Sequence, residues 1–126
     1  MFELTEDEFM QVVTDAIEDL PEEFKSKLDN VDVVVEDHPP RSVLKKLPRR
    51  GLILGLYQGI PPKYRTSRYG VRPVMPDKIS LYRKNIERVC SSREEVYGQI
   101  RKTLLHEIGH HFSLTDPNFT GLSRVA

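Results

Sequence analysis

The residues with the clearest chemical pattern lie near the C-terminal end of the chain, in the stretch TLLHEIGHHFSLTD. Within it, His106, Glu107 and His110 form the pattern H-E-x-x-H. In a helix, residues four apart lie about 40° apart around the axis and about 6 Å apart along it, so both imidazoles can reach one metal ion. The glutamate lies beside these ligands, where its carboxylate can take a proton from metal-bound water. The pattern therefore indicates a zinc site with Glu107 as its general base.

Two histidines are too few for catalytic zinc, which usually takes three protein ligands and leaves one position for water. Asp116 follows His110 by six residues, a gap that lets a helix end and the chain turn back to the same metal. The resulting set of His106, His110 and Asp116 resembles the metzincin-type arrangement H-E-x-x-H-x-x-G-x-x-H/D. Ligand type separates zinc poorly from nickel, cobalt or iron, so the identity of the metal stays open.

A helix predicted from about Ser92 to Phe112 would carry these side chains. His111 lies 100° around this helix from His110, so it cannot face the same metal. We expect it to be a half-buried histidine that donates to a backbone carbonyl or a carboxylate. The two ligand histidines point away from the apolar side of the helix, together with Gln99 and Thr103. That apolar side is formed by Tyr97, Ile100, Leu104 and Ile108.

The residue patterns in the rest of the chain predict an α+β fold, with one helix followed by three strands and then the motif helix. The first helix is expected from about Thr5 to Leu20, because Thr5 and Glu8 have capping-box spacing. A short helical turn follows across Glu22 to Leu28. The strand at Lys78–Arg83 is the candidate edge strand, whose free backbone groups could pair with an extended peptide. Alternating apolar residues place the strands at Val31–Glu36, Leu52–Gln58 and Lys78–Arg83.

The length of 126 residues fits a single domain, 1–126, with one core. No apolar run approaches the roughly 20 residues that a membrane span needs. The start of the chain is acidic and lacks the basic-then-apolar pattern of a signal peptide. We therefore expect a cytoplasmic protein. Cys90 is the only cysteine, which excludes a disulfide within the chain and a site made of several thiolates.

The charges are unevenly distributed although they sum to zero. Residues 1–37 carry 13 acids and 2 bases, and residues 38–72 carry 9 bases and no acid. The basic segment could contact phosphates. A nucleic-acid-binding domain usually has a net positive charge, however, and the acidic first third can neutralise this segment in the fold. The sequence therefore disfavours nucleic acid as a partner.

Beyond the motif, the segments LILGLYQGIP, MPDKISLYRKNIE and TLLHEIGHHFSLTD resemble, in this order, the small bacterial minimal-zincin family of metallopeptidases. The resemblance covers roughly Gly51 to Asp116. It implies a compact domain in which a small mixed sheet packs on an N-terminal helix and on the C-terminal motif helix. It also implies metal ligands at His106, His110 and Asp116 and the general base at Glu107.

One residue departs from the family pattern, because the glycine three residues after the second histidine is Ser113 here. Glycine readily takes positive φ to reverse the chain. A serine there must either bear a strain of order ~1 kcal/mol or turn differently.

The sequence thus favours a small zinc-dependent peptidase that acts on a peptide or protein substrate. A rival is a zinc-stabilised protein-interaction module without turnover, since so short a chain leaves little material for substrate pockets. Hydrolysis of a non-peptide amide or ester is a further alternative. A side-chain donor for the oxyanion could come from Tyr57, Tyr69, Tyr82 or Arg124, and the sequence does not choose among them.

Overall fold

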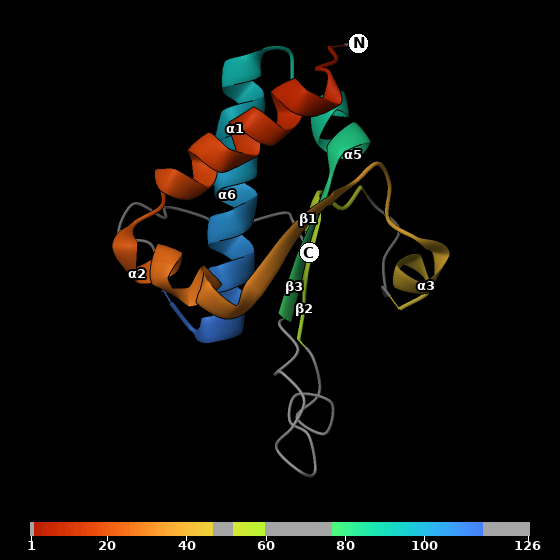
Figure 1. Cartoon of the computed structure of the whole chain (residues 1–126). Coiled ribbons are helices and arrows are strands. Elements are labelled where there is room, and N and C mark those ends of the chain that lie inside the picture. Colours follow the sequence, from red (N-terminus) through yellow and green to blue (C-terminus); the bar gives the residue numbers. More distant parts are fainter. Residues whose placement is uncertain (1, 47–51, 60–76, 115–126) are drawn as a thin grey trace.

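The computed structural model describes residues 2–46, 52–59 and 77–114, and these residues form an α+β fold (Figure 1). A small mixed sheet of three strands packs against helices at both ends of the chain. In chain order the elements are α1 (Glu6–Glu18), α2 (Glu22–Lys25), the 3-10 helix η1 (Ser26–Asn30), β1 (Val31–Glu36), α3 (Arg41–Leu44), β2 (Gly55–Gln58), β3 (Asp77–Tyr82), α5 (Arg83–Arg88) and α6 (Arg93–Phe112).

The first helix begins at the side chain expected to cap it, and the last helix begins at a side-chain cap that was not predicted. The Thr5 hydroxyl accepts the Glu8 N–H at 3.1 Å, and the Glu8 carboxylate accepts the Thr5 N–H at 2.8 Å, so the predicted capping box is confirmed. Ser92 caps α6 by accepting the Glu95 N–H at 3.1 Å. The helical turn expected after the first helix is also confirmed, as α2 followed by η1.

Strand β3 lies in the centre of the sheet, so the expectation that it forms the edge is wrong. The strand order is β1-β3-β2, with β3 parallel to β1 and antiparallel to β2. Ile79, Ser80 and Leu81 are fully buried, as in a strand covered on both faces. Alternation along a strand indicates which face each side chain takes, but it does not indicate how many neighbours the strand has. Strand β2 packs against α6.

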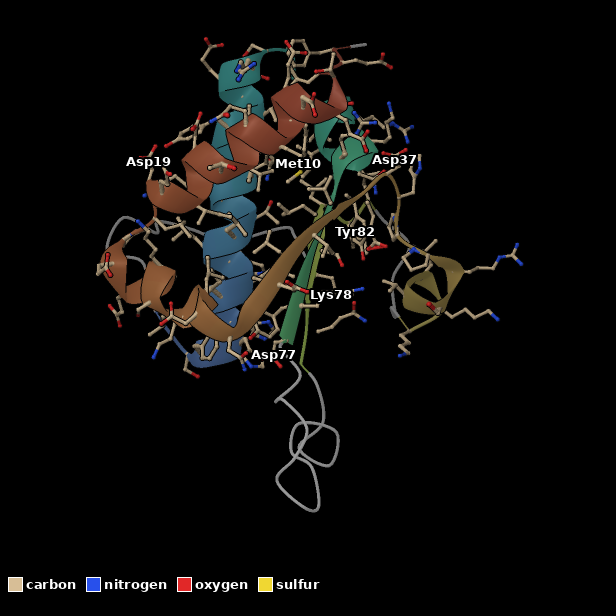
Figure 2. The ribbon with its side chains drawn as sticks, viewed as in Figure 1. Met10, Asp19, Asp37, Asp77, Lys78 and Tyr82 are labelled. Carbon is tan, nitrogen blue, oxygen red and sulfur yellow. The ribbon has the colours of Figure 1, made fainter. Side chains whose placement is uncertain are left out.

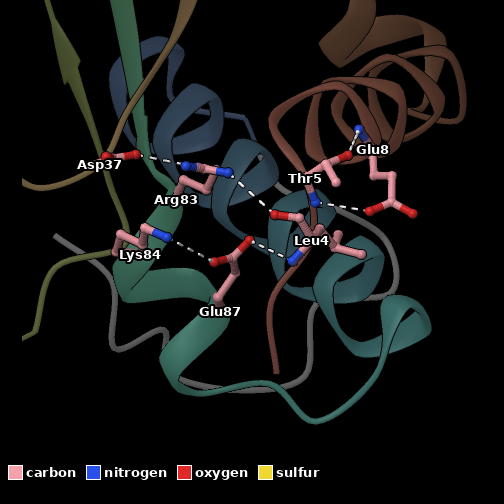
Figure 3. Close-up of polar contacts among 7 residues, drawn as sticks. All are labelled: Leu4, Thr5, Glu8, Asp37, Arg83, Lys84 and Glu87. Atoms are coloured by element: carbon pink, nitrogen blue, oxygen red, sulfur yellow. Dashed lines mark hydrogen bonds and ion pairs between the residues drawn. The ribbon is translucent and has the colours of Figure 1, made fainter. Parts of the chain in front are cut away.

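Two short helices, α3 and α5, were not predicted. Helix α5 begins at Arg83, which was expected to be the last residue of a strand. Its Glu87 Oε2 accepts the Leu4 N–H at 3.1 Å, and Arg83 Nη1 donates to the Leu4 carbonyl at 3.3 Å (Figure 3). Asn85 Nδ2 donates to the Ile53 carbonyl at 2.8 Å. Helix α5 therefore fixes both the segment before α1 and the segment before β2.

The main core lies between α1, α6 and one face of the sheet, where α1 crosses α6 (Figure 1). Val43, Ile53 and Tyr82 form a smaller cluster on the other face. Among the described helices, none has an apolar stretch long enough to cross a membrane. The main core is built mostly from Phe9, Val12, Val13 and Ala16 of α1, Ile79 and Leu81 of β3, and Ile100, Leu104 and Ile108 of α6.

Strand β2 approaches α6 closely at Gly55. A Cβ atom on this glycine would lie 2.6 Å from Thr103 Cγ2 and 3.0 Å from the Ser80 carbonyl oxygen. Thr103, expected on the polar side of the helix, is instead fully buried. A glycine inside a strand often marks such an approach of two backbones. Gly55 thus lets β2 lie against the motif helix.

Replacing Gly55 with alanine should force β2 away from α6 and lower the free energy of unfolding by about 2 kcal/mol, as overpacking of a filled core does. Urea unfolding of the variant measures this loss. Thr103→Ser removes the methyl group that the new Cβ would meet and keeps the hydroxyl that donates to the Gln99 carbonyl. Adding it to Gly55→Ala should restore part of the loss. An unchanged loss in the double variant would show that the clash lies elsewhere.

Candidate metal centre

His106 and His110 lie one turn apart on α6, with their rings on the same side of the helix. The ring centres are 6.1 Å apart and the ring planes differ by 30°. The His106 side chain is 23% exposed, and His110 is exposed. Imidazoles that bind one ion at about 2.0–2.1 Å in tetrahedral geometry have ring centres about 5 Å apart, so a side-chain movement of about 1 Å would bring both rings to one metal.

Glu107 is buried beside the two histidines, and its two carboxylate oxygens have different surroundings. Oε1 accepts the backbone N–H of Tyr57 at 2.9 Å. Oε2 lies 3.8 Å from His106 Nε2 and finds no hydrogen-bond donor among the residues that the structure describes. A buried acceptor without a donor is rare in native proteins and needs an explanation. A water molecule or a metal on the side of the histidines would supply one.

The same burial changes the acidity of Glu107. Loss of solvent raises the pKa of the Glu107 carboxyl from 4.5 to about 7, although the hydrogen bond from the Tyr57 N–H acts in the opposite direction. A carboxyl group with a pKa near neutrality can both accept and release a proton at neutral pH. Glu107 is thus suited to acid-base chemistry without help from a second carboxylate.

The position of Tyr57 in the sheet explains why its N–H is available to Glu107. The Leu54 carbonyl accepts the Tyr82 N–H across the sheet at 2.9 Å. In an antiparallel pair, alternate residues turn their N–H and C=O groups to the same neighbour. Leu56 and Gln58 therefore face β3, while Gly55 and Tyr57 turn their backbone groups to the outer edge. Among the described strands, none pairs with this edge of β2.

Helix α6 ends in a tight reversal close to these histidines. Ser113 adopts the left-handed conformation, with φ 56° and ψ 43°, so it takes the strained option of the two expected for a serine at this position. Its N–H and the N–H of Leu114 both bond to the Gly109 carbonyl, the latter at 2.9 Å. A Cβ atom on Gly109 would lie 3.0 Å from the Leu114 carbonyl oxygen. Gly109, which lies between Glu107 and His110, therefore leaves room for Leu114.

Asp116, the expected third ligand, lies outside the described residues. Within the described ranges, no group of three His, Cys, Asp or Glu side chains is placed to hold a metal ion. The pair of imidazoles together with the unbonded oxygen of Glu107 fits a divalent metal with a water molecule. The assignment of Asp116 as the ligand that completes the set stays a prediction.

His111 turns away from the other two histidines and stacks on Tyr57. The two ring centres are 4.0 Å apart with an angle of 16° between the planes. The His111 side chain is 39% exposed, and its Nε2 lies 3.7 Å from Asp77 Oδ2. The expected carboxylate neighbour is thus present, at the distance of an ion pair rather than a hydrogen bond. Sequence patterns did not point to Asp77, which is 5% exposed at the start of β3.

Two of the four candidates for an oxyanion donor are described. Tyr57 donates its hydroxyl hydrogen to Asp77 Oδ2 at 2.5 Å, so this hydrogen is already used. Tyr82 is fully buried in the cluster on the other face of the sheet. Tyr69 and Arg124 lie outside the described residues. The described part of the chain therefore assigns no side chain to the oxyanion.

Comparisons with known proteins identify the family to which this chain is similar. Residues 28–124 match the family model of zincin-like metallopeptidases, which confirms the resemblance inferred from the sequence. Among solved structures, the chain is similar to a conserved hypothetical protein from Thermus thermophilus. The two share 26% sequence identity with a TM-score of 0.57, and the match covers 86% of this chain and 94% of that chain. Among curated proteins, no match was found.

The raised pKa of Glu107 predicts that the free energy of unfolding of the metal-free protein falls as the pH rises. Between pH 4.5 and about 7 the folded chain holds a proton that the unfolded chain has released, so the stability that this group contributes is lost as the pH rises through this window. Glu107→Gln keeps an acceptor for Tyr57 and removes the charge. In EDTA, the variant should exceed the wild type in free energy of unfolding by about 3 kcal/mol at pH 8, and by much less at pH 5.

Urea unfolding at the two pH values measures this difference. The matched control is Glu94→Gln, which removes an exposed carboxylate from the first turn of the same helix. That variant should show no gain at pH 8. Equal stability of wild type and Glu107→Gln at both pH values would contradict the burial of a charge at Glu107.

Proposed function

Since this chain belongs to the zincin-like metallopeptidase family, we propose that it hydrolyses peptide bonds with zinc as its cofactor. His106 and His110 hold the metal from α6, Asp116 is the third ligand, and Glu107 is the general base. The carboxylate of Glu107 is the observation that carries this proposal. One of its oxygens is fixed by a backbone N–H, and the other is turned toward His106 and accepts no hydrogen bond from the residues that the structure describes.

Zinc bound at this place would polarise the scissile carbonyl and lower the pKa of a water molecule. Residues of the chain transfer the proton and orient the base. Oε2 of Glu107 takes the proton from the attacking water and passes it to the leaving amine. Oε1 stays on the Tyr57 N–H, so the carboxylate keeps its orientation while the proton moves. Burial raises the pKa of Glu107 in the metal-free protein, and a bound cation would act in the opposite direction and favour the carboxylate form that a base needs.

The outer edge of β2 is the surface that we propose for the peptide substrate. This replaces the expectation that placed the peptide on β3, because β3 is paired on both sides. The N–H and C=O of Gly55 and the C=O of Tyr57 point to the outer edge, where an extended peptide can add as a strand. The same edge carries the N–H that holds Glu107, so a peptide paired there lies beside the general base.

Purified, untagged protein should contain about one zinc ion per chain, as expected for a single site with three protein ligands. His106→Ala should lose this metal, because one ligand remains on α6. The matched control is His38→Ala, which removes an exposed histidine near the end of β1 and should leave the metal content unchanged. Elemental analysis measures all three proteins. If the wild type failed to bind even added zinc, the metallopeptidase proposal would fall.

Glu107→Gln should retain zinc and lose peptide hydrolysis by a factor of about 10²–10⁴, the usual contribution of a general base. A peptide library screened by mass spectrometry identifies a substrate and the rate. Glu87→Gln is the matched control, because Glu87 is also a buried glutamate that accepts a backbone N–H but lies in α5. Its rate should equal that of the wild type. Zinc binding without any turnover in the wild type would favour the interaction module instead.

A further inference from the structure

Tyr57, Asp77 and His111 form a cluster that joins three elements beside the proposed site. Tyr57 lies in β2, Asp77 is the first residue of β3, and His111 lies in the last turn of α6. The Tyr57 hydroxyl donates to Asp77 Oδ2 at 2.5 Å. The same oxygen lies 3.7 Å from His111 Nε2, and the Tyr57 ring stacks on the His111 ring. Each member thus contacts the other two.

This cluster is linked to Glu107 by the geometry of the helix. His111 follows Glu107 by four residues, so the two side chains lie on the same face of α6, one turn apart. Tyr57 spans this turn, with its backbone N–H on Glu107 and its ring on His111. Through its hydroxyl it is also tied to Asp77, whose side chain is 7% exposed. The orientation of the Glu107 carboxylate therefore depends on Tyr57, whose side chain is held in turn by Asp77 and His111.

A strand as short as β2 needs such support to hold a general base accurately. It has four residues, and among the described strands only β3 pairs with it. A glutamate side chain rotates about several bonds, and a catalytic group must stay within about 0.5 Å of its productive position. A single hydrogen bond from the end of a short strand fixes Glu107 only as well as the strand itself is fixed. The bond to Asp77 and the stacking on His111 supply that restraint.

We propose that Asp77 and His111 are positioning residues, which hold Tyr57 so that its backbone N–H keeps Glu107 directed at the substrate. The proposal rests on the proposed function in giving Glu107 the role of base. Its structural content is independent of activity, because it states what holds the amide of residue 57. Neither residue touches the substrate or the metal in this role. Both act through the backbone of β2.

Hydrogen exchange of the amide at residue 57 tests the proposal directly. In Tyr57→Phe the ring can still stack on His111, but the bond to Asp77 is lost. The amide of residue 57 should then exchange about tenfold faster, corresponding to the loss of about one hydrogen bond. The amide of Leu56, which faces β3, serves as the reference within the same strand and corrects for any change in global stability. An unchanged ratio of the two exchange rates would overturn the proposal.

Tyr97→Phe is a closely matched control. Tyr97 lies on α6, and its hydroxyl, like that of Tyr57, donates to a carboxylate oxygen, that of Asp19, at 2.5 Å. Asp19 lies at the end of α1, far from Asp77 in Figure 2. This variant loses the same kind of bond away from Glu107, so its exchange ratio should equal that of the wild type. A ratio raised as much as in Tyr57→Phe would assign the effect to general loosening and overturn the proposal.

Variants of Asp77 separate positioning from simple stabilisation. Asp77→Asn keeps an oxygen that accepts the Tyr57 hydroxyl, so the exchange ratio should stay close to that of the wild type. Asp77→Ala should raise it as Tyr57→Phe does. A raised ratio in Asp77→Asn but not in Asp77→Ala would contradict the role of the acceptor. Should Asp77→Ala fail to fold, Tyr57→Phe alone decides.

Steady-state kinetics provide a second test of the proposal. With a peptide substrate in hand, Tyr57→Phe should lower kcat about tenfold and leave KM and zinc content unchanged, because only the orientation of the base is affected. An equal kcat in the two proteins would overturn the proposal. If the wild type hydrolyses no peptide, the proposed function fails, and the exchange ratio still decides whether the cluster holds the amide of residue 57.

Discussion

The hydrogen bond from the Tyr57 N–H to Glu107 is the interaction on which the candidate site depends. A carboxylate that is almost fully buried is costly unless a donor compensates for the water that it has lost. The donor here is a backbone amide on the outer edge of β2, which reaches the carboxylate only because β2 lies close to α6. That closeness requires Gly55, since any larger residue would meet Thr103 and the Ser80 carbonyl. A glycine in a strand thus determines the surroundings of a glutamate on a helix.

The same hydrogen bond gives the two oxygens of the Glu107 carboxylate different surroundings. Oε1 has a structural role, because it accepts the hydrogen bond from the Tyr57 N–H at the edge of the sheet. Oε2 is the oxygen to which we assign the proposed proton transfer, because it is turned toward His106 and has no donor among the described residues. Burial of the whole group raises its pKa to about 7, whereas the two histidines lie nearer to solvent. One helix therefore carries the proposed metal ligands on its accessible side and the proposed general base on its buried side, next to each other in sequence.

Local sequence patterns predicted the features that depend on residues close in sequence, such as the cap of the first helix. They did not predict strand order or burial, which depend on contacts between distant segments. The cap at Thr5 and the helix that carries His106 and His110 follow from patterns a few residues long, and both are present in the structure. The central position of β3 depends on pairing with β1 and β2 from either side. Thr103 was placed on the polar side because a helical projection does not include the strand that covers it. Asp77 has no local signal, since the contacts that define its proposed role come from Tyr57 and His111, which are distant from it in sequence.

The turn after the motif shows how a serine is accommodated where the family pattern has glycine. Ser113 stands where the family has glycine, and it adopts the left-handed conformation at a cost of about 1 kcal/mol. Two N–H groups bonded to the Gly109 carbonyl favour this conformation. The absence of a side chain at Gly109 leaves space for Leu114 to pass over the end of α6. The space for the reversal is therefore provided by Gly109 inside the helix, whereas the residue at 113 determines the strain that the turn carries.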